Sequence, residues 1–179
     1  MSIRSLTTEA IVLKRSTTGE ADRIITLLTK ERGKIACVAK GIRKMTSSKG
    51  ASLETGNYIK CHLILTKSLP ILTQASLLED CHATRESLSK IRQLSQLLEI
   101  FDQLFVEDDD TADLFSDALK LRSQVTQTAT SSKAVRLGLE NLMIKLGYQD
   151  PKETAYQTIL EYVSALSEKP MRSWEYLKV

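Results

Sequence analysis

The chain has 179 residues, of which 42% are hydrophobic and 26% are charged, a composition typical of a folded globular protein with one large or two small domains. Its apolar runs are far shorter than the roughly 18 residues that a membrane-spanning helix needs, and its first residues lack the apolar stretch of an export signal. Three cysteines are an odd number, which argues against a disulfide framework. We therefore expect a cytoplasmic protein.

Basic residues are concentrated in the first half of the sequence. Residues 1–80 hold 13 Lys and Arg against 7 Asp and Glu, whereas residues 81–179 hold 12 against 15. Within residues 30–49, seven basic residues accompany a single acid. Such an excess can bind phosphates through counterion release, but it is equally typical of a solvated, lysine-rich surface. The charge pattern alone leaves both interpretations open.

The first eighty residues have the pattern of short strands separated by turns. Alternation, β-branched residues and turn signals predict five strands, at 10–13, 23–29, 34–39, 58–66 and 71–78. In the fourth strand, Ile59, Cys61 and Leu63 would share one face. The Gly- and Ser-rich segment 40–57 is predicted to be a long loop, of a length that is often functional. Five short strands at fairly even spacing indicate a small closed barrel.

From about residue 83 the hydrophobic period is that of helices. A long first helix is predicted by an apolar stripe at spacings of three and four, formed by Leu88, Ile91, Leu94, Leu98, Phe101 and Phe105. A second helix would start at an Asp110 or Thr111 cap, and residues 123–132 would form a polar linker. Two further helices are expected from Val135 to Leu146 and from Ala155 to Leu166.

These elements predict an α+β protein in which a five-stranded barrel precedes a helical domain. The predicted domains are residues 1–80, which form the barrel, and residues 81–179, which are helical.

The sequence offers little support for an enzyme. It contains no phosphate-binding glycine loop and no nucleophile elbow, and only two histidines are available as bases. Four soft ligands occur in the pairs Cys61-His62 and Cys81-His82, but neighbouring residues on a strand point to opposite faces and cannot easily converge on one zinc ion. We expect no catalytic residue, no metal and no cofactor.

An ordered series of segments resembles the bacterial recombination mediator RecO family. These segments are Glu9–Leu13, Gly19–Ile24, Lys30–Lys34, Val38–Arg43, Leu69–Ala75, Leu77–Glu79, Leu142–Tyr148, Asp150–Pro151, Glu161–Tyr162, Pro170–Ser173 and Leu177. The resemblance is strongest over residues 9–43. It implies an N-terminal OB-fold barrel and a C-terminal α-helical domain. Many members carry a four-cysteine zinc module after the Leu-Gly-Tyr segment, whereas here a helix is expected directly after Pro151, so the chain looks like a short form without that module.

The resemblance also implies a function in DNA repair and homologous recombination. Such a mediator binds single- and double-stranded DNA, anneals complementary strands, and assists recombinase loading with RecR and often RecF. Annealing makes no covalent bond, so the expected site consists of cations that reduce repulsion between the strands. The candidate DNA-binding residues are Lys34, Lys40, Arg43, Lys44, Lys49, Arg15 and Arg23. Lys34 and Lys40 would share one strand face, although each candidate could equally be an exposed surface charge.

Residues 1–80 contain a single aromatic residue, Tyr58, whereas OB-fold grooves usually stack bases on aromatic side chains. We therefore expect salt-sensitive binding that is dominated by phosphates. In the helical domain, the resemblance implies a pocket for the acidic, apolar-ended tail of single-stranded DNA-binding protein. The candidates there are Lys133 and Arg136, beside Leu137 and Leu139, although an ordinary amphipathic helix would explain them equally well.

Two other functions stay open. A basic barrel does not itself distinguish DNA from RNA, so an OB-fold RNA-binding or ribosome-associated factor is the main alternative. A scaffold whose helices assemble a complex is the other.

Overall fold

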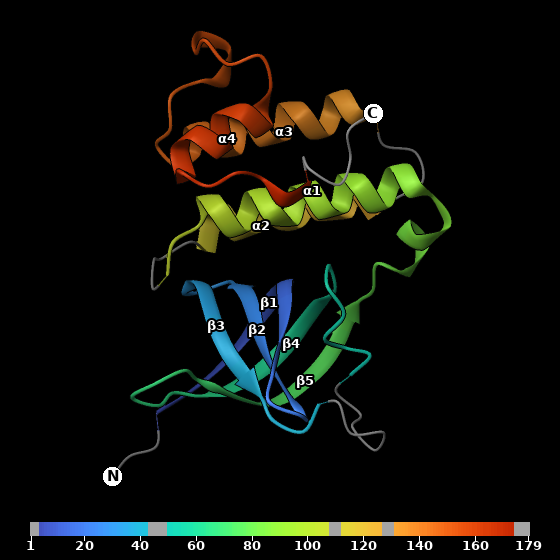
Figure 1. Ribbon diagram of the computed structural model, residues 1–179, viewed down its shortest axis with the longest axis vertical. Helices are drawn as coiled ribbons and strands as arrows, with labels where there is room; N and C mark the ends of the chain where they lie inside the picture. Colours follow the sequence, from blue (N-terminus) through green and yellow to red (C-terminus); the bar gives the residue numbers. More distant parts are fainter. Residues whose placement is uncertain (1–3, 43–49, 108–111, 127–130, 174–179) are drawn as a thin grey trace. The chain divides into compact units, whose positions relative to one another are not determined.

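The computed structural model describes residues 4–42, 50–107, 112–126 and 131–173 (Figure 1). The chain divides into two compact units. The first comprises the residues up to Asp80 together with a short segment that begins at Glu107, and the second comprises Cys81–Val106 and the residues from Asp113 onward. That residues 1–80 and 81–179 act as separate functional domains stays a prediction.

The first unit is a closed five-stranded barrel. Its strands are β1 (Ser5–Thr18), β2 (Asp22–Thr29), β3 (Gly33–Ala39), β4 (Tyr58–Ile64) and β5 (Ile71–Glu79). They follow one another around the barrel in the order β1-β2-β3-β5-β4. Neighbouring strands are antiparallel except β3 and β5, which pair in parallel between Val38 and Ile71. The predicted OB-fold is thereby confirmed.

The barrel core follows the predicted alternation. Ile59, Cys61 and Leu63 of β4 all point inward and are at most 2% exposed. Two further core residues, Ile42 and Leu53, come from the segment between β3 and β4 rather than from a strand. This segment is therefore part of the barrel's hydrophobic core at both of its described ends.

The second unit is helical. Its helices are α1 (Leu88–Leu104), α2 (Ala112–Thr126), α3 (Ser132–Lys145) and α4 (Ile159–Ser167), with short 3-10 turns η1 (His82–Glu86) and η2 (Pro151–Glu153). The four expected helices are present, so the α+β fold class is confirmed.

Two predicted bounds in the helical unit are wrong, the start of the linker after α2 and the start of α4. Leu88 is 68% exposed and Ile91 is 40% exposed, so the buried stripe of α1 begins only at Leu94. The α2 helix continues to Thr126, which shortens the predicted linker, while the predicted cap at Asp110 or Thr111 lies outside the described residues.

The α4 helix begins later than predicted because of its cap. The Thr158 side chain accepts a hydrogen bond from the Glu161 backbone, and the Glu161 side chain accepts one from the Thr158 backbone. This reciprocal capping box starts the helix at Ile159 and leaves Ala155 outside it. Among the helices that the structure describes, none is long and apolar enough to cross a membrane.

Candidate nucleic-acid interface

Three of the predicted site residues lie at one end of the barrel, where β1 ends, β2 begins and β3 ends. Arg15 is opposite Ile25, Arg23 is opposite Ala39, and Lys40 directly follows Ala39. We call Arg15, Arg23 and Lys40 the barrel-end cations. Lys40 is exposed and Arg23 is partly exposed. Lys40 was predicted on the third strand, but β3 ends at Ala39, so that Lys40 is the first residue of the following turn.

The backbone after Lys40 is tied to the start of β2. The Gly41 N–H donates to Oδ1 of Asp22 at 2.7 Å. Gly41 has a φ of 65°, a left-handed conformation that glycine adopts without a steric penalty. Lys40 is therefore held at a fixed place beside Arg23 by a contact that does not use either cation.

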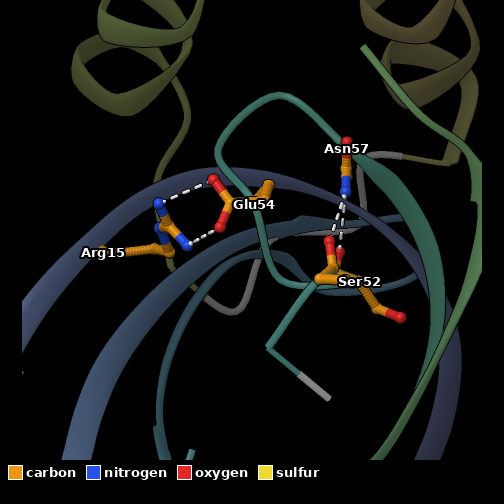
Figure 2. A network of polar contacts seen from close by, with 5 residues as sticks. Arg15, Ser52, Glu54 and Asn57 are labelled. Atoms are coloured by element: carbon orange, nitrogen blue, oxygen red, sulfur yellow. Dashed lines mark hydrogen bonds and ion pairs between the residues drawn. The ribbon is translucent and has the colours of Figure 1, made fainter. Parts of the chain in front are cut away.

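Arg15 has a carboxylate in its guanidinium fork (Figure 2). Its Nη1 and Nη2 donate to Oε1 and Oε2 of Glu54 at 2.6 and 2.8 Å. The two side chains are 22% and 35% exposed, so this ion pair is partly shielded from water. In this arrangement the planar fork of Arg15 is occupied by Glu54 rather than open to a phosphate.

Lys34 lies away from the barrel-end cations. It is a partly exposed residue at the start of β3, where it lines a groove of about 280 Å³ together with Arg32 and the turn between β4 and β5. Glu107 also lines this groove, and its backbone bridges to Gly33 and Lys34. Lys34 and Lys40 are an even number of residues apart, as residues on one face of a strand are. However, six residues of extended chain separate them by roughly 20 Å. Arg32 was not predicted, because nothing in the spacing of a turn residue indicates that it borders a groove.

The remaining predicted DNA-binding residues, Arg43, Lys44 and Lys49, lie outside the described residues.

Tyr58, the aromatic residue of the barrel region, is engaged in a polar network. Its hydroxyl donates to Oε2 of Glu9 at 2.6 Å, and the Lys30 Nζ lies 3.9 Å from the same carboxylate oxygen. Partial burial and the hydrogen bond to Glu9 raise the pKa of Tyr58 to about 12. The phenol therefore stays protonated at neutral pH and serves as a donor to Glu9.

The predicted pair of the helical unit lies in a pocket. Lys133 and Arg136 line a cavity of about 470 Å³ with Leu137, Glu140 and Lys152. Leu137 is 43% exposed and contributes apolar surface, whereas Leu139 is buried in the core and does not line the pocket. Lys152 was not predicted, because it follows a chain reversal at Gly147 that helical spacing does not reveal.

Glu140, which lines this pocket, has a buried side chain that is 3% exposed. It contacts Nε of Arg136 at 3.0 Å and Nζ of Lys152 at 2.9 Å. Burial opposes its charge, but the hydrogen bonds and charges of Lys152 and Arg136 outweigh burial and lower the pKa of Glu140. The hydrogen bond to Glu140 in turn raises the pKa of Lys152.

The adjacent residues Cys61 and His62, which were considered as zinc ligands, point to opposite faces of β4. Cys61 points into the barrel core, whereas His62 faces outward with its Nδ1 2.7 Å from the Thr7 hydroxyl. Across the ranges that the structure describes, no three His, Cys, Asp or Glu residues are placed to hold a metal ion.

Comparison with known proteins gives a consistent result. Residues 1–80 match the family model described as recombination protein O N terminal. A DNA repair protein RecO from Heliobacterium modesticaldum is 38% identical over 107 residues, which are 60% of this chain and 39% of that protein. One from Roseiflexus is 32% identical over 149 residues, which are 83% of this chain and 52% of the relative. One from Nocardioides is 47% identical over 70 residues, or 39% of this chain and 29% of that protein. The chain thus spans about half, or less, of the length of these relatives.

Proposed function

We propose that this chain is a DNA repair and recombination mediator of the RecO family, which binds single- and double-stranded DNA and anneals complementary strands, because residues 1–80 match the family model and several RecO proteins are similar to the chain. Assistance in recombinase loading, with RecR and with RecF as a further candidate partner, is part of this proposal. The structural observation that supports DNA binding most directly is the OB-fold barrel whose one end gathers Arg23 and Lys40.

Annealing requires two polyanions to approach each other, and cations on the protein reduce their repulsion by displacing counterions. Lys40 supplies an exposed ammonium group at a backbone position that Asp22 and Gly41 fix. Lys34 and Arg32 supply a second contact point at the other end of β3. The roughly 20 Å between the two points equals about six nucleotide steps of one strand in a duplex.

Phosphates rather than bases should carry most of the affinity. Tyr58, the single aromatic residue among residues 1–80, already donates to Glu9. Base stacking on aromatic side chains is the usual source of base contacts in an OB-fold groove. The expected binding is therefore weakly selective for sequence and strongly weakened by salt.

For the helical unit we propose that the pocket around Glu140 receives the acidic, apolar-ended tail of single-stranded DNA-binding protein. Lys133, Arg136 and Lys152 surround the pocket, and with Glu140 they leave a net charge of +2. The exposed side chain of Leu137 offers the apolar contact that such a tail needs. Glu140 orients two of the cations, which prepares them for a carboxylate partner.

The DNA-binding site is tested by the affinity for a single-stranded oligonucleotide, measured by fluorescence anisotropy over a range of salt concentrations. Lys40→Glu is expected to weaken binding about tenfold and to reduce the slope of log K against log salt by about 1. Lys60→Glu makes the same charge change at an exposed position on β4 and is expected to weaken binding by no more than about twofold.

Equal losses in the two variants would place the site elsewhere. No binding by the wild-type chain at low salt would contradict the proposed function. Preferred binding of an RNA of matched sequence would favour the RNA-binding alternative.

A further inference from the structure

The loop between β3 and β4 is anchored to β1 over its described residues 50–57. The Gly56 N–H donates to the Val12 carbonyl at 2.8 Å, and the Val12 N–H donates to the Asn57 carbonyl at 2.9 Å. Leu53 is fully buried in the barrel core. The loop is therefore held by backbone hydrogen bonds and by one apolar side chain, in addition to its side-chain contacts.

Asn57 gives the same loop its internal shape (Figure 2). Its Nδ2 donates to the carbonyl oxygens of Ala51 and Ser52 at 3.0 and 3.1 Å. Because Asn57 is only 3% exposed, these bonds are shielded from water and hold the turn firmly. Glu54 lies on this turn, directly after Leu53.

The ion pair between Arg15 and Glu54 joins this loop to the last third of β1. Figure 2 shows the guanidinium and the carboxylate facing each other with two parallel hydrogen bonds. A bidentate pair fixes orientation as well as distance, because both planar groups must remain coplanar. The pair therefore determines where the loop stands beside the barrel end.

We propose that Arg15 and Glu54 are a positioning pair for DNA binding, and that Arg15 acts through Glu54 rather than by touching phosphate itself. The inference rests on the proposed function. The connection to the other barrel-end cations runs through the core: Leu53 belongs to the same buried cluster as Ala39 and Ile42, which flank Lys40 and Gly41. The ion pair restrains Glu54 and therefore also the adjacent residue Leu53. Leu53, packed in the core, in turn stabilises the backbone around Lys40.

The direction in which one substitution changes the DNA affinity distinguishes this proposal from a purely electrostatic effect. Glu54→Gln removes a negative charge from a DNA-binding surface, so electrostatics alone predicts tighter binding. Glutamine has only one acceptor oxygen for the guanidinium, so the bidentate ion pair is lost, and this loss predicts a misplaced loop and weaker binding. The two effects act in opposite directions, and the pair is 22% and 35% exposed, which is shielded enough for its geometry to matter.

The experiment compares the affinity for a single-stranded oligonucleotide among the wild type, Glu54→Gln, Arg15→Lys and Glu20→Gln. Glu54→Gln and Arg15→Lys are each expected to weaken binding about fivefold, since lysine keeps the charge but cannot form the fork. Glu20→Gln is the matched control, an exposed acid in the turn after β1, and is expected to tighten binding by no more than about twofold. Unchanged or tighter binding by Glu54→Gln would overturn the proposal, and tighter binding would show that Glu54 masks Arg15 as a phosphate ligand.

A second measurement reports on the loop without DNA. Amide hydrogen exchange at Val12 and Gly56 is expected to accelerate in Glu54→Gln and to stay unchanged in Glu20→Gln. The reversed pair Arg15→Glu/Glu54→Arg is expected to recover binding relative to Arg15→Glu alone. Unchanged exchange, or no recovery in a folded reversed pair, would contradict a positioning role.

A failure of the proposed DNA-binding function can be distinguished from a failure of the positioning role of Arg15 and Glu54. If the wild type does not bind DNA, the proposed function fails and the inference fails with it. If the wild type binds DNA and Lys40→Glu weakens binding while Glu54→Gln does not, the inference alone fails.

Discussion

Glu140 is a carboxylate whose charge the fold retains in spite of burial. Arg136 and Lys152 lower its pKa below the ordinary value of 4.5, so the folded state binds the proton less readily than the unfolded chain. The resulting stabilisation is fully present above the ordinary carboxyl pKa and is lost as the pH falls through the lowered value in the folded state.

The expected result is a free energy of unfolding that falls from about pH 6 to about pH 3, with a smaller fall in Glu140→Gln. Urea denaturation at several pH values measures both. Because Arg136 and Lys152 are mostly exposed, we expect the variant to lose only about 1 kcal/mol at neutral pH. An identical pH dependence in wild type and variant would show that Glu140 does not contribute to it.

The barrel thiols are expected to be unreactive. Burial, with a contribution from the neighbouring Cys61, raises the pKa of Cys37 to about 12. Burial and the charge of Glu31 raise the pKa of Cys61 to about 12. Because the thiolate is the reactive form, a thiol reagent at about pH 8 should label neither residue before the barrel unfolds. Denaturant should expose all three cysteines of the chain, and mass spectrometry locates the labels. Rapid labelling of Cys37 or Cys61 in the native protein would be inconsistent with their buried positions.

At the scale of the element, the loop between β3 and β4 contributes a buried side chain to the barrel core, as the strands do. Leu53 is fully buried in the barrel core, although it lies in a loop. Leu53→Ala is expected to lower the free energy of unfolding by about 3 kcal/mol, through lost apolar burial and a cavity. Leu78→Ala on β5, where the side chain is 47% exposed, is the control and should cost less than about 1 kcal/mol. Equal costs would mean that the loop does not complete the core.

Most strands and helices could be predicted because their buried faces leave a periodic pattern in the sequence. Alternation placed Ile59, Cys61 and Leu63 on the inner face correctly. The ends of β1 were missed because only its middle is apolar, while its outer residues are polar. The exposure of the start of α1 could not be predicted, because periodicity marks an apolar face but does not reveal whether another element covers it.

The site could be predicted only in part. The density of basic residues within 30–49 pointed to Lys40, and the pairing of β2 with β3 places Arg23, a further candidate, beside it. That the two residues bind DNA stays a prediction. The carboxylate partner of Arg15 could not be predicted from the sequence. Glu54 is 39 residues away, in a loop whose sequence has no hydrophobic periodicity. Lys152 was missed for a similar reason, since a chain reversal places it against α3.

At the scale of the whole molecule, the net charge of +3 hides an excess of basic residues in the first eighty residues. This asymmetry is consistent with a polyanion bound at the barrel and an acidic tail bound by a local basic pocket in the helical unit. Both proposed contacts should weaken with salt, and the proposed DNA contact should weaken more steeply because it would neutralise several phosphates at once.

We propose that this chain anneals complementary DNA through cations on its barrel. The most direct measurement is the rate at which complementary strands coated with single-stranded DNA-binding protein anneal with the wild type, with Arg23→Glu/Lys40→Glu, and without added protein. We expect acceleration by the wild type and loss of that acceleration in the double variant, whose fold is verified by circular dichroism. An annealing rate with the wild type that equals the rate without protein at low salt would contradict the proposed annealing function.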